Sequence, residues 1–169
     1  AIVSGRLIPV KGIDALLAAW DRMPFDLRQQ WTLLFVGDGP LKDLIRSAGR
    51  RHAPGEIVQL DERQPAEVVP YYAASDLLIF SSLADNWGLV VNEAMVCGLP
   101  VMCSRLAGCA DDMIQEGRNG WLFDPTRPGD FDRVLATALM HGRTPAMARC
   151  AQETALRFTP EIMAEGFRR

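Results

Sequence analysis

The chain has 169 residues, which suits a single domain, and 49% of them are hydrophobic, enough to form a core. Its formal net charge of −3 disfavours a nucleic-acid surface, because binding to phosphates requires clustered Lys and Arg. No apolar run approaches the ~20 residues of a membrane-spanning helix, so we expect a soluble protein.

Strand-like and helix-like patterns alternate along the chain. Strands are expected near residues 2–3, 32–36, 57–59, 76–80, 100–103 and 121–123. Helices are expected near residues 13–21, 40–48, 66–73, 88–97 and 110–115, followed by helical patterns alone at 131–140, 145–157 and 160–167. This order predicts an α/β fold with a doubly wound, Rossmann-like parallel sheet and flanking helices.

A polar loop follows the fourth predicted strand, at the carboxyl edge of the sheet, where open α/β sheets bind ligands. Gly88 allows a sharp turn there, which would present the N–H groups of Gly88, Leu89 and Val90 to an anion such as a diphosphate. Glu93 is expected in the first turn of the next helix, where its carboxylate could accept hydrogen bonds from a ribose diol. With Asp85 in the loop, the pattern predicts a sugar-nucleotide site.

Two other predicted strands also end in residues suited to a nucleotide. Arg6 and Lys11 follow the first strand and could neutralise a pyrophosphate without a metal ion, although an exposed cation pair is the simpler interpretation of these two alone. The second strand ends in the turn 37–40, Gly-Asp-Gly-Pro, with Pro40 expected at the first helical position. This turn could reverse the chain locally, bind a nucleotide, or do both.

Taken in order, these segments resemble the retaining GT-B glycosyltransferases of group 1, or family 4. Asp85 and Glu93 within DNWGLVVNEAMVCGLPV resemble the family's Glu-x7-Glu signature. Residues 4–7 (SGRL) with Lys11-Gly12 resemble its GRL…KG segment, 35–40 (FVGDGP) resemble its VGDGP, and 116–122 (EGRNGWL) resemble its DGxNGxL. Each motif alone is weak, but together, in the right order over residues 2–125, they are specific.

The resemblance implies that residues 1–169 are the donor-nucleotide domain, the C-terminal half of a GT-B fold, and that an N-terminal acceptor domain is absent from the chain. By matched position, Arg6 and Lys11 would bind the diphosphate, Glu93 the ribose and Asp85 the donor sugar, and these four would be the catalytic residues. Further contacts to the donor would come from Gly5, Gly37, Asp38, Gly39, Gln59, Leu60, Asn86, Gly88, Leu89 and Val90.

The implied reaction transfers a sugar from a nucleoside diphosphate sugar to an acceptor, with retention and without a metal ion or other cofactor. The acceptor would be a glycan, a lipid-linked molecule or a small molecule bound by the missing domain, as in glycan or glycolipid biosynthesis. One departure is that Asp85 and Asn86-Trp87 stand where Glu and Pro-Phe are common in the family. The shorter Asp85 leaves the donor sugar open, and Asn86 could share its contact.

Three other functional classes share parts of this pattern. A non-catalytic nucleotide-binding module of the same fold stays open as an alternative. Paired carboxylates also suit a glycosidase, but nothing in the sequence supplies a second wall for a sugar cleft. A dinucleotide oxidoreductase is disfavoured because GRLIPVKG, and not G-x-G-x-x-G, follows the first strand.

Further residue types have simpler interpretations. The four cysteines form no C-x2-C pair, so we expect buried free thiols and no metal site. Free thiols suit a cytoplasmic protein. Peripheral association of the full-length protein with the inner membrane stays open. The chain lacks an initiator Met, so we expect an excised piece. His52 and His141 are expected in surface or capping roles. Trp87 could line the pocket or pack in the core, whereas Trp20, Trp31 and Trp121 are expected in the core.

Overall fold

The computed structural model describes residues 1–158, and the helix predicted at 160–167 lies outside the described residues. Six parallel strands form one sheet in the order β3-β2-β1-β4-β5-β6. They are β1 (Ile2–Ser4), β2 (Leu33–Val36), β3 (Ile57–Leu60), β4 (Leu78–Phe80), β5 (Val101–Ser104) and β6 (Gly120–Phe123). This order is that of a Rossmann-like doubly wound sheet, so the predicted fold class is confirmed.

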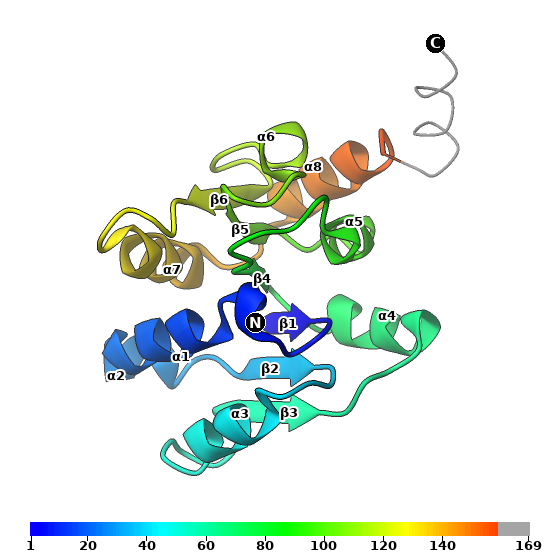
Figure 1. Cartoon of the computed structure of the whole chain (residues 1–169). Helices are drawn as coiled ribbons and strands as arrows, with labels where there is room; N and C mark the ends of the chain where they lie inside the picture. Colours follow the sequence, from blue (N-terminus) through cyan, green and yellow to red (C-terminus); the bar gives the residue numbers. More distant parts are fainter. Residues whose placement is uncertain (159–169) are drawn as a thin grey trace.

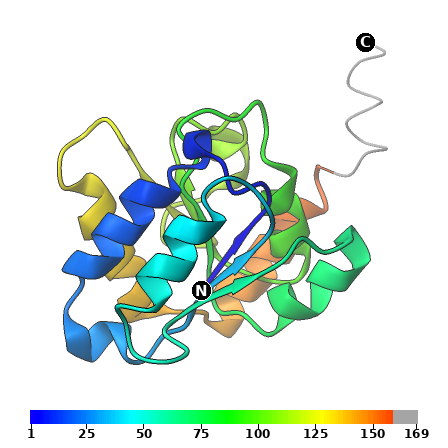
Figure 2. The same cartoon turned by 60° about the horizontal axis from the view of Figure 1, so that its bottom comes forward.

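Helices cover both faces of the sheet (Figure 1). One face carries α1 (Ile13–Arg22), α2 (Phe25–Arg28), α3 (Lys42–Gly49) and α7 (Asp130–His141). The other face carries α4 (Pro65–Ala73), α5 (Leu89–Val96), α6 (Ala110–Met113) and α8 (Pro145–Ala155). Figure 2, turned so that the edge strand β3 comes forward, shows the sheet between these two layers.

Each face of the sheet has its own hydrophobic core. Ile79 of β4 packs in one core with Trp20, whereas its neighbours Leu78 and Phe80 pack in the other core with Tyr72. Because successive strand residues point to opposite faces, a strand covered on both sides must be apolar throughout. This requirement explains why the strands read as short, continuous apolar runs in the sequence.

The element boundaries differ from the predicted ones by a few residues. Pro40 was predicted at the first helical position, which is wrong: α3 begins at Lys42, and Pro40 lies in the preceding turn. The N–H of Leu41 donates to the carbonyl oxygen of Leu7, so the chain is held against the loop after β1 before the helix starts. Helix α2 and the 3-10 turn Pro9–Lys11 were not predicted, since such short elements show no periodicity.

Candidate functional site

The strand order creates a switch point between β1 and β4. The chain leaving β1 continues into α1 on one face, whereas the chain leaving β4 continues into α5 on the other face. The two loops therefore diverge at the carboxyl edge of the sheet and leave a crevice between them. In open α/β sheets this crevice is where ligands bind.

Lys11 and Asp85 form an ion pair across this crevice, one from each of the two loops. Their side chains are only 25% and 18% exposed. Lys11 Nζ also lies 5.2 Å from the centroid of the Phe80 ring. The hydroxyl of Ser81 donates to the Lys11 carbonyl oxygen at 2.7 Å, which fixes one loop to the other. Two of the predicted catalytic residues are thus brought together from 74 positions apart in the sequence.

A pocket of about 340 Å³ opens beside the ion pair. It is lined by Lys11, Phe80, Asp85, Asn86, Trp87, Gly88, Leu89 and Val90. Its volume falls within the ~300–1,000 Å³ of small-ligand sites. An adjoining crevice includes Gly5 and Arg6 and shares Lys11 and Phe80 with this pocket. Most of the residues predicted to contact a donor therefore lie in the two linings around the switch point.

The start of α5 forms the electropositive wall of this pocket. Gly88 precedes the helix with φ of 96°, and a Cβ at this position would lie 2.8 Å from the Phe80 ring. Only glycine meets both conditions. Within residues 1–158, the N–H groups of Gly88, Leu89 and Val90 donate to no protein acceptor. Such unpaired N–H groups at the positive end of a helix dipole favour an anion.

Glu93 lies outside this pocket lining. Its predicted place in the first turn of the helix is wrong, because α5 begins at Leu89 and Glu93 is the fifth residue of the helix. It is exposed, and the hydroxyl of the buried Tyr72 from α4 donates to Glu93 Oε2 at 3.1 Å. Burial raises the pKa of the Tyr72 phenol, so that it stays protonated and remains a donor. Tyr72 belongs to none of the predicted motifs; its i, i+4 spacing from the buried Val68 is the signal that marks it as inward-facing.

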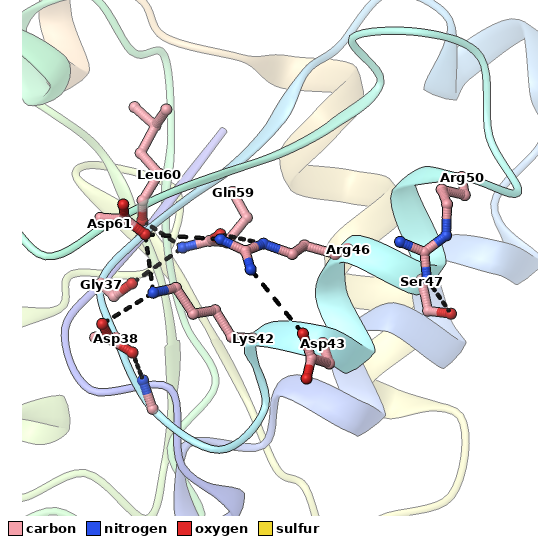
Figure 3. A network of polar contacts seen from close by, with 11 residues as sticks. Gly37, Asp38, Lys42, Asp43, Arg46, Ser47, Arg50, Gln59, Leu60 and Asp61 are labelled. Carbon is pink, nitrogen blue, oxygen red and sulfur yellow. Dashed lines mark hydrogen bonds and ion pairs between the residues drawn. The ribbon is translucent and has the colours of Figure 1, made fainter.

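The remaining predicted residues lie where β2 and β3 end (Figure 3). Asp38 Oδ1 accepts from the Gly39 N–H at 2.7 Å, and its other oxygen accepts from Lys42 at 2.9 Å. Lys42 also pairs with Asp61 at 2.8 Å. Hydrogen bonds from Lys42 lower the pKa of both Asp38 and Asp61. The Asp38 side chain is therefore engaged in local turn and ion-pair contacts.

Gln59 is also held by its neighbours. Its Nε2 donates to the carbonyl oxygens of Leu60, at 2.7 Å, and Gly37, at 3.2 Å, while Arg46 donates to its Oε1 at 3.0 Å. A Cβ on Gly37 would come within 1.9 Å of the Gly5 carbonyl oxygen, so only glycine allows β2 and the loop after β1 to approach this closely. These residues form a second group along the same edge of the sheet. The binding roles of both groups stay predictions.

Burial and contacts decide the predictions made for the histidines and tryptophans. His52 was predicted at the surface or as a cap, which is wrong: its ring lies between Glu56, at 2.9 Å, and Asp21, at 2.7 Å, in a largely buried polar cluster. His141 Nδ1 contacts the Thr137 carbonyl oxygen near the end of α7, as expected of a capping residue. Trp87 is half-buried in the pocket wall. Trp20 and Trp121 are buried, and Trp31 is half-buried against the core.

The thiols are free, with Cys103 and Cys109 buried and Cys97 and Cys150 half-buried. Among residues 1–158, no three His, Cys, Asp or Glu side chains are grouped so that they could hold a metal ion. None of the described helices has the length and apolar character to cross a membrane.

Comparison with known proteins gives relatives over nearly the whole chain. The sulfoquinovosyl transferase SQD2 of Arabidopsis thaliana is 34% identical over 143 residues, which are 82% of this chain and 26% of that protein. The D-inositol 3-phosphate glycosyltransferase of Rhodococcus jostii (strain RHA1) is 32% identical over 171 residues, 96% of this chain and 37% of that protein. The chain thus spans about a quarter to two-fifths of these relatives' length.

Solved structures agree with the fold. Anabaena Alr3699/HepE in complex with UDP superposes with a TM-score of 0.76 at 29% identity, over 98% of this chain and 48% of that chain. Its complex with UDP and glucose gives a TM-score of 0.74 at 28% identity, over 98% and 47%. The family model described as "Glycosyl transferases group 1" matches residues 1–156. The chain therefore belongs to the group 1 glycosyl transferases.

Proposed function

We propose that this chain is the donor-nucleotide half of a GT-B glycosyltransferase and that its donor is a UDP-sugar. The observation that carries the proposal is the pocket at the switch point, which is lined by Lys11 and by three residues whose N–H groups have no acceptor within residues 1–158. These groups suit a diphosphate. UDP is favoured over other nucleotides because Alr3699/HepE, at 29% identity, is described in complex with UDP.

Each predicted residue has a role in this proposal. Lys11 and Arg6 hold the diphosphate, and Asp85, with Asn86 beside it, binds the donor sugar. Glu93, oriented by Tyr72, accepts from the ribose hydroxyls. The base lies along the ends of β2 and β3, against Gly37–Gly39 and Gln59-Leu60. The side chains of Asp38 and Gln59 are engaged by neighbours, so backbone groups of this second group provide most of the base contacts.

The proposed chemistry is departure of UDP from the sugar. Negative charge grows on the leaving diphosphate in the transition state, and Lys11, Arg6 and the N–H groups of α5 would stabilise it. No metal ion is needed in this scheme, and configuration at the sugar is retained. A second domain of the full-length protein, preceding this one, supplies a glycan, lipid-linked or small-molecule acceptor. These assignments are supported by the family and by the cations in the crevice.

Calorimetric titration of the chain with UDP, GDP, ADP and NAD, each in the presence of EDTA, tests the proposal. We expect UDP to bind most tightly and its affinity to survive the chelator. Arg6→Ala and Lys11→Ala should each weaken UDP binding more than uridine binding, because their proposed partner is the phosphate. Equal losses for UDP and uridine, or a preference for NAD, would contradict the proposal.

A further inference from the structure

Trp87 in the pocket wall is held by two residues that do not line the pocket. Its indole Nε1–H donates to Asn92 Oδ1 at 2.7 Å. Its ring lies against Phe158, with centroids 5.5 Å apart and planes inclined by 50°. Phe158 follows α8, so the wall of the pocket is in contact with a segment 71 positions further along the sequence.

Asn92 connects these two residues. Besides accepting from Trp87, its side-chain amide donates through Nδ2 to the Phe158 carbonyl oxygen at 3.2 Å. Both ends of the amide are therefore committed, which fixes one orientation. Asparagine is an unfavourable residue within a helix, and Asn92 is the fourth residue of α5. Its two polar contacts explain the presence of asparagine at this position, whereas helix stability does not.

Trp87 is in turn connected to the carboxylate proposed to meet the sugar. The backbone N–H of Trp87 donates to Asp85 Oδ1 at 3.2 Å. A change in the position of Trp87 would therefore reorient Asp85 as well as the indole wall. A Phe at position 87 could fill the same wall, but it would lack the indole donor that ties the wall to Asn92.

We propose that Asn92 is a positioning residue that holds Trp87 and, through it, Asp85 for the donor sugar, and that Trp87 is a specificity-determining contact with that sugar. This inference rests on the proposed function, since it assigns the sugar end of the same pocket. UDP alone occupies the phosphate and base ends and is affected little. The ratio of affinities for a UDP-sugar and for UDP therefore isolates the role of Asn92 from a general effect on the fold.

The test measures UDP and UDP-glucose affinities of the unchanged chain and of the variants Asn92→Leu, Trp87→Phe and their combination. Loss of one net hydrogen bond should weaken UDP-glucose binding about three- to tenfold in either single variant. UDP binding should stay within about twofold. Since both changes break the same contact, the double variant should bind UDP-glucose only slightly more weakly than the weaker-binding single variant does.

Gln152→Leu is the matched control. Gln152 on α8 donates to the Val96 carbonyl oxygen at 3.3 Å, so it also bridges α8 to α5 through a side-chain amide, but it does not reach Trp87. Gln152→Leu should leave the ratio of the UDP-glucose affinity to the UDP affinity unchanged. If Gln152→Leu lowers the ratio as much as Asn92→Leu does, the effect is one of helix packing and the inference is wrong.

The indole N–H signals in a ¹H–¹⁵N spectrum supply a second readout. The chain has four tryptophans, and the Trp87 signal is the one that Trp87→Phe removes. Asn92→Leu should move this signal, and UDP-glucose should move it in the unchanged chain more than UDP does.

If UDP binds but the affinity ratio is unchanged in both single variants, the inference fails and the proposed function stands. If no nucleotide binds, both fail. Trp87→Phe decides the matter alone if Asn92→Leu does not fold.

Discussion

Lys11 and Asp85 pair with each other in the pocket, and a bound donor would change what each of them contacts. An ammonium group has three donors, so Lys11 can turn part of its hydrogen bonding to a diphosphate while Asp85 turns to the sugar. In UDP alone no sugar is present for Asp85 to meet. When UDP alone is bound, the negative charge of Asp85 repels the diphosphate and competes with it for Lys11.

Asp85→Asn should therefore bind UDP more tightly, by about three- to tenfold, because a like charge is removed and Lys11 is released. The same variant should lose preference for a UDP-sugar over UDP. Calorimetry on both ligands measures this. Asp132→Asn makes the same charge change at the exposed Arg22–Asp132 pair, outside the proposed site, and should leave both affinities as they were. Weaker UDP binding by Asp85→Asn would mean that Asp85 positions Lys11 for the phosphate.

Tyr72 and Glu93 form a second functional pair. Glu93→Ala should weaken UDP binding by ~1–3 kcal/mol through the loss of hydrogen bonds from the ribose to a charged acceptor. Tyr72→Phe should have a smaller effect in the same direction, because the carboxylate stays but loses its orienting donor. Tyr71→Phe removes a hydroxyl from the adjacent, half-buried residue and is the control. If Tyr72→Phe binds UDP as the unchanged chain does, Tyr72 has no part in positioning Glu93.

Among the elements, the turn into α5 depends on a single residue type. Gly88 combines a left-handed backbone with close approach to Phe80. Gly88→Ala should therefore destabilise the chain and displace the N–H groups of the pocket wall. Gly129, before α7, has a similar φ of 77°, but a Cβ added there would meet no atom within 4 Å.

Comparison of Gly88→Ala with Gly129→Ala thus separates backbone strain from the clash. Both should lose ~1 kcal/mol or more of unfolding free energy from the left-handed conformation. Only Gly88→Ala should lose further stability and UDP affinity. Urea denaturation and calorimetry give the two quantities. Equal stability losses with intact UDP binding would show that the pocket wall adapts to a methyl group.

The elements themselves could be predicted because their patterns are local. Buried parallel strands such as 78–80 are apolar at every position, and the glycine before α5 marks a turn in any context. The contacts that build the site are not local: Lys11 meets Asp85, Tyr72 meets Glu93, and Asn92 meets Phe158 only after the sheet has formed. Sequence motifs singled out Lys11, Asp85 and Glu93, but not their pairing, and no role was assigned to Tyr72, Asn92 or Phe158.

At the scale of the whole molecule, a buried polar cluster lies at the opposite edge of the sheet from the pocket. Glu56 directly precedes β3 and accepts from Trp20 of α1 at 3.0 Å, and it pairs with Arg28 of α2 and with His52. Burial by itself would raise the pKa of Glu56, but the Trp20 hydrogen bond and the charges of Arg28 and His52 together hold that pKa below its ordinary value. The cluster therefore stabilises the fold while Glu56 is ionised.

Glu56→Gln should reduce the free energy of unfolding by ~1–3 kcal/mol at pH 7. A lowered folded-state pKa contributes stability that is present above the ordinary pKa of 4.5 and is lost as the pH falls through the folded-state value. The difference between the variant and the unchanged chain should therefore shrink below pH 4.5. UDP affinity should be unaffected at pH 7, because the cluster lies at the far edge. A difference that is constant with pH would contradict the role of the charge.

The central claim is that a diphosphate binds in the crevice between β1 and β4, against the start of α5. Titration of the ¹⁵N-labelled chain with UDP in the presence of EDTA, followed by backbone amide signals, tests it most directly. The amides of Gly88, Leu89 and Val90 donate to no acceptor within residues 1–158, so a phosphate should move their signals the most. If UDP binds and these three signals stay in place while others shift, the site is elsewhere and the claim is wrong.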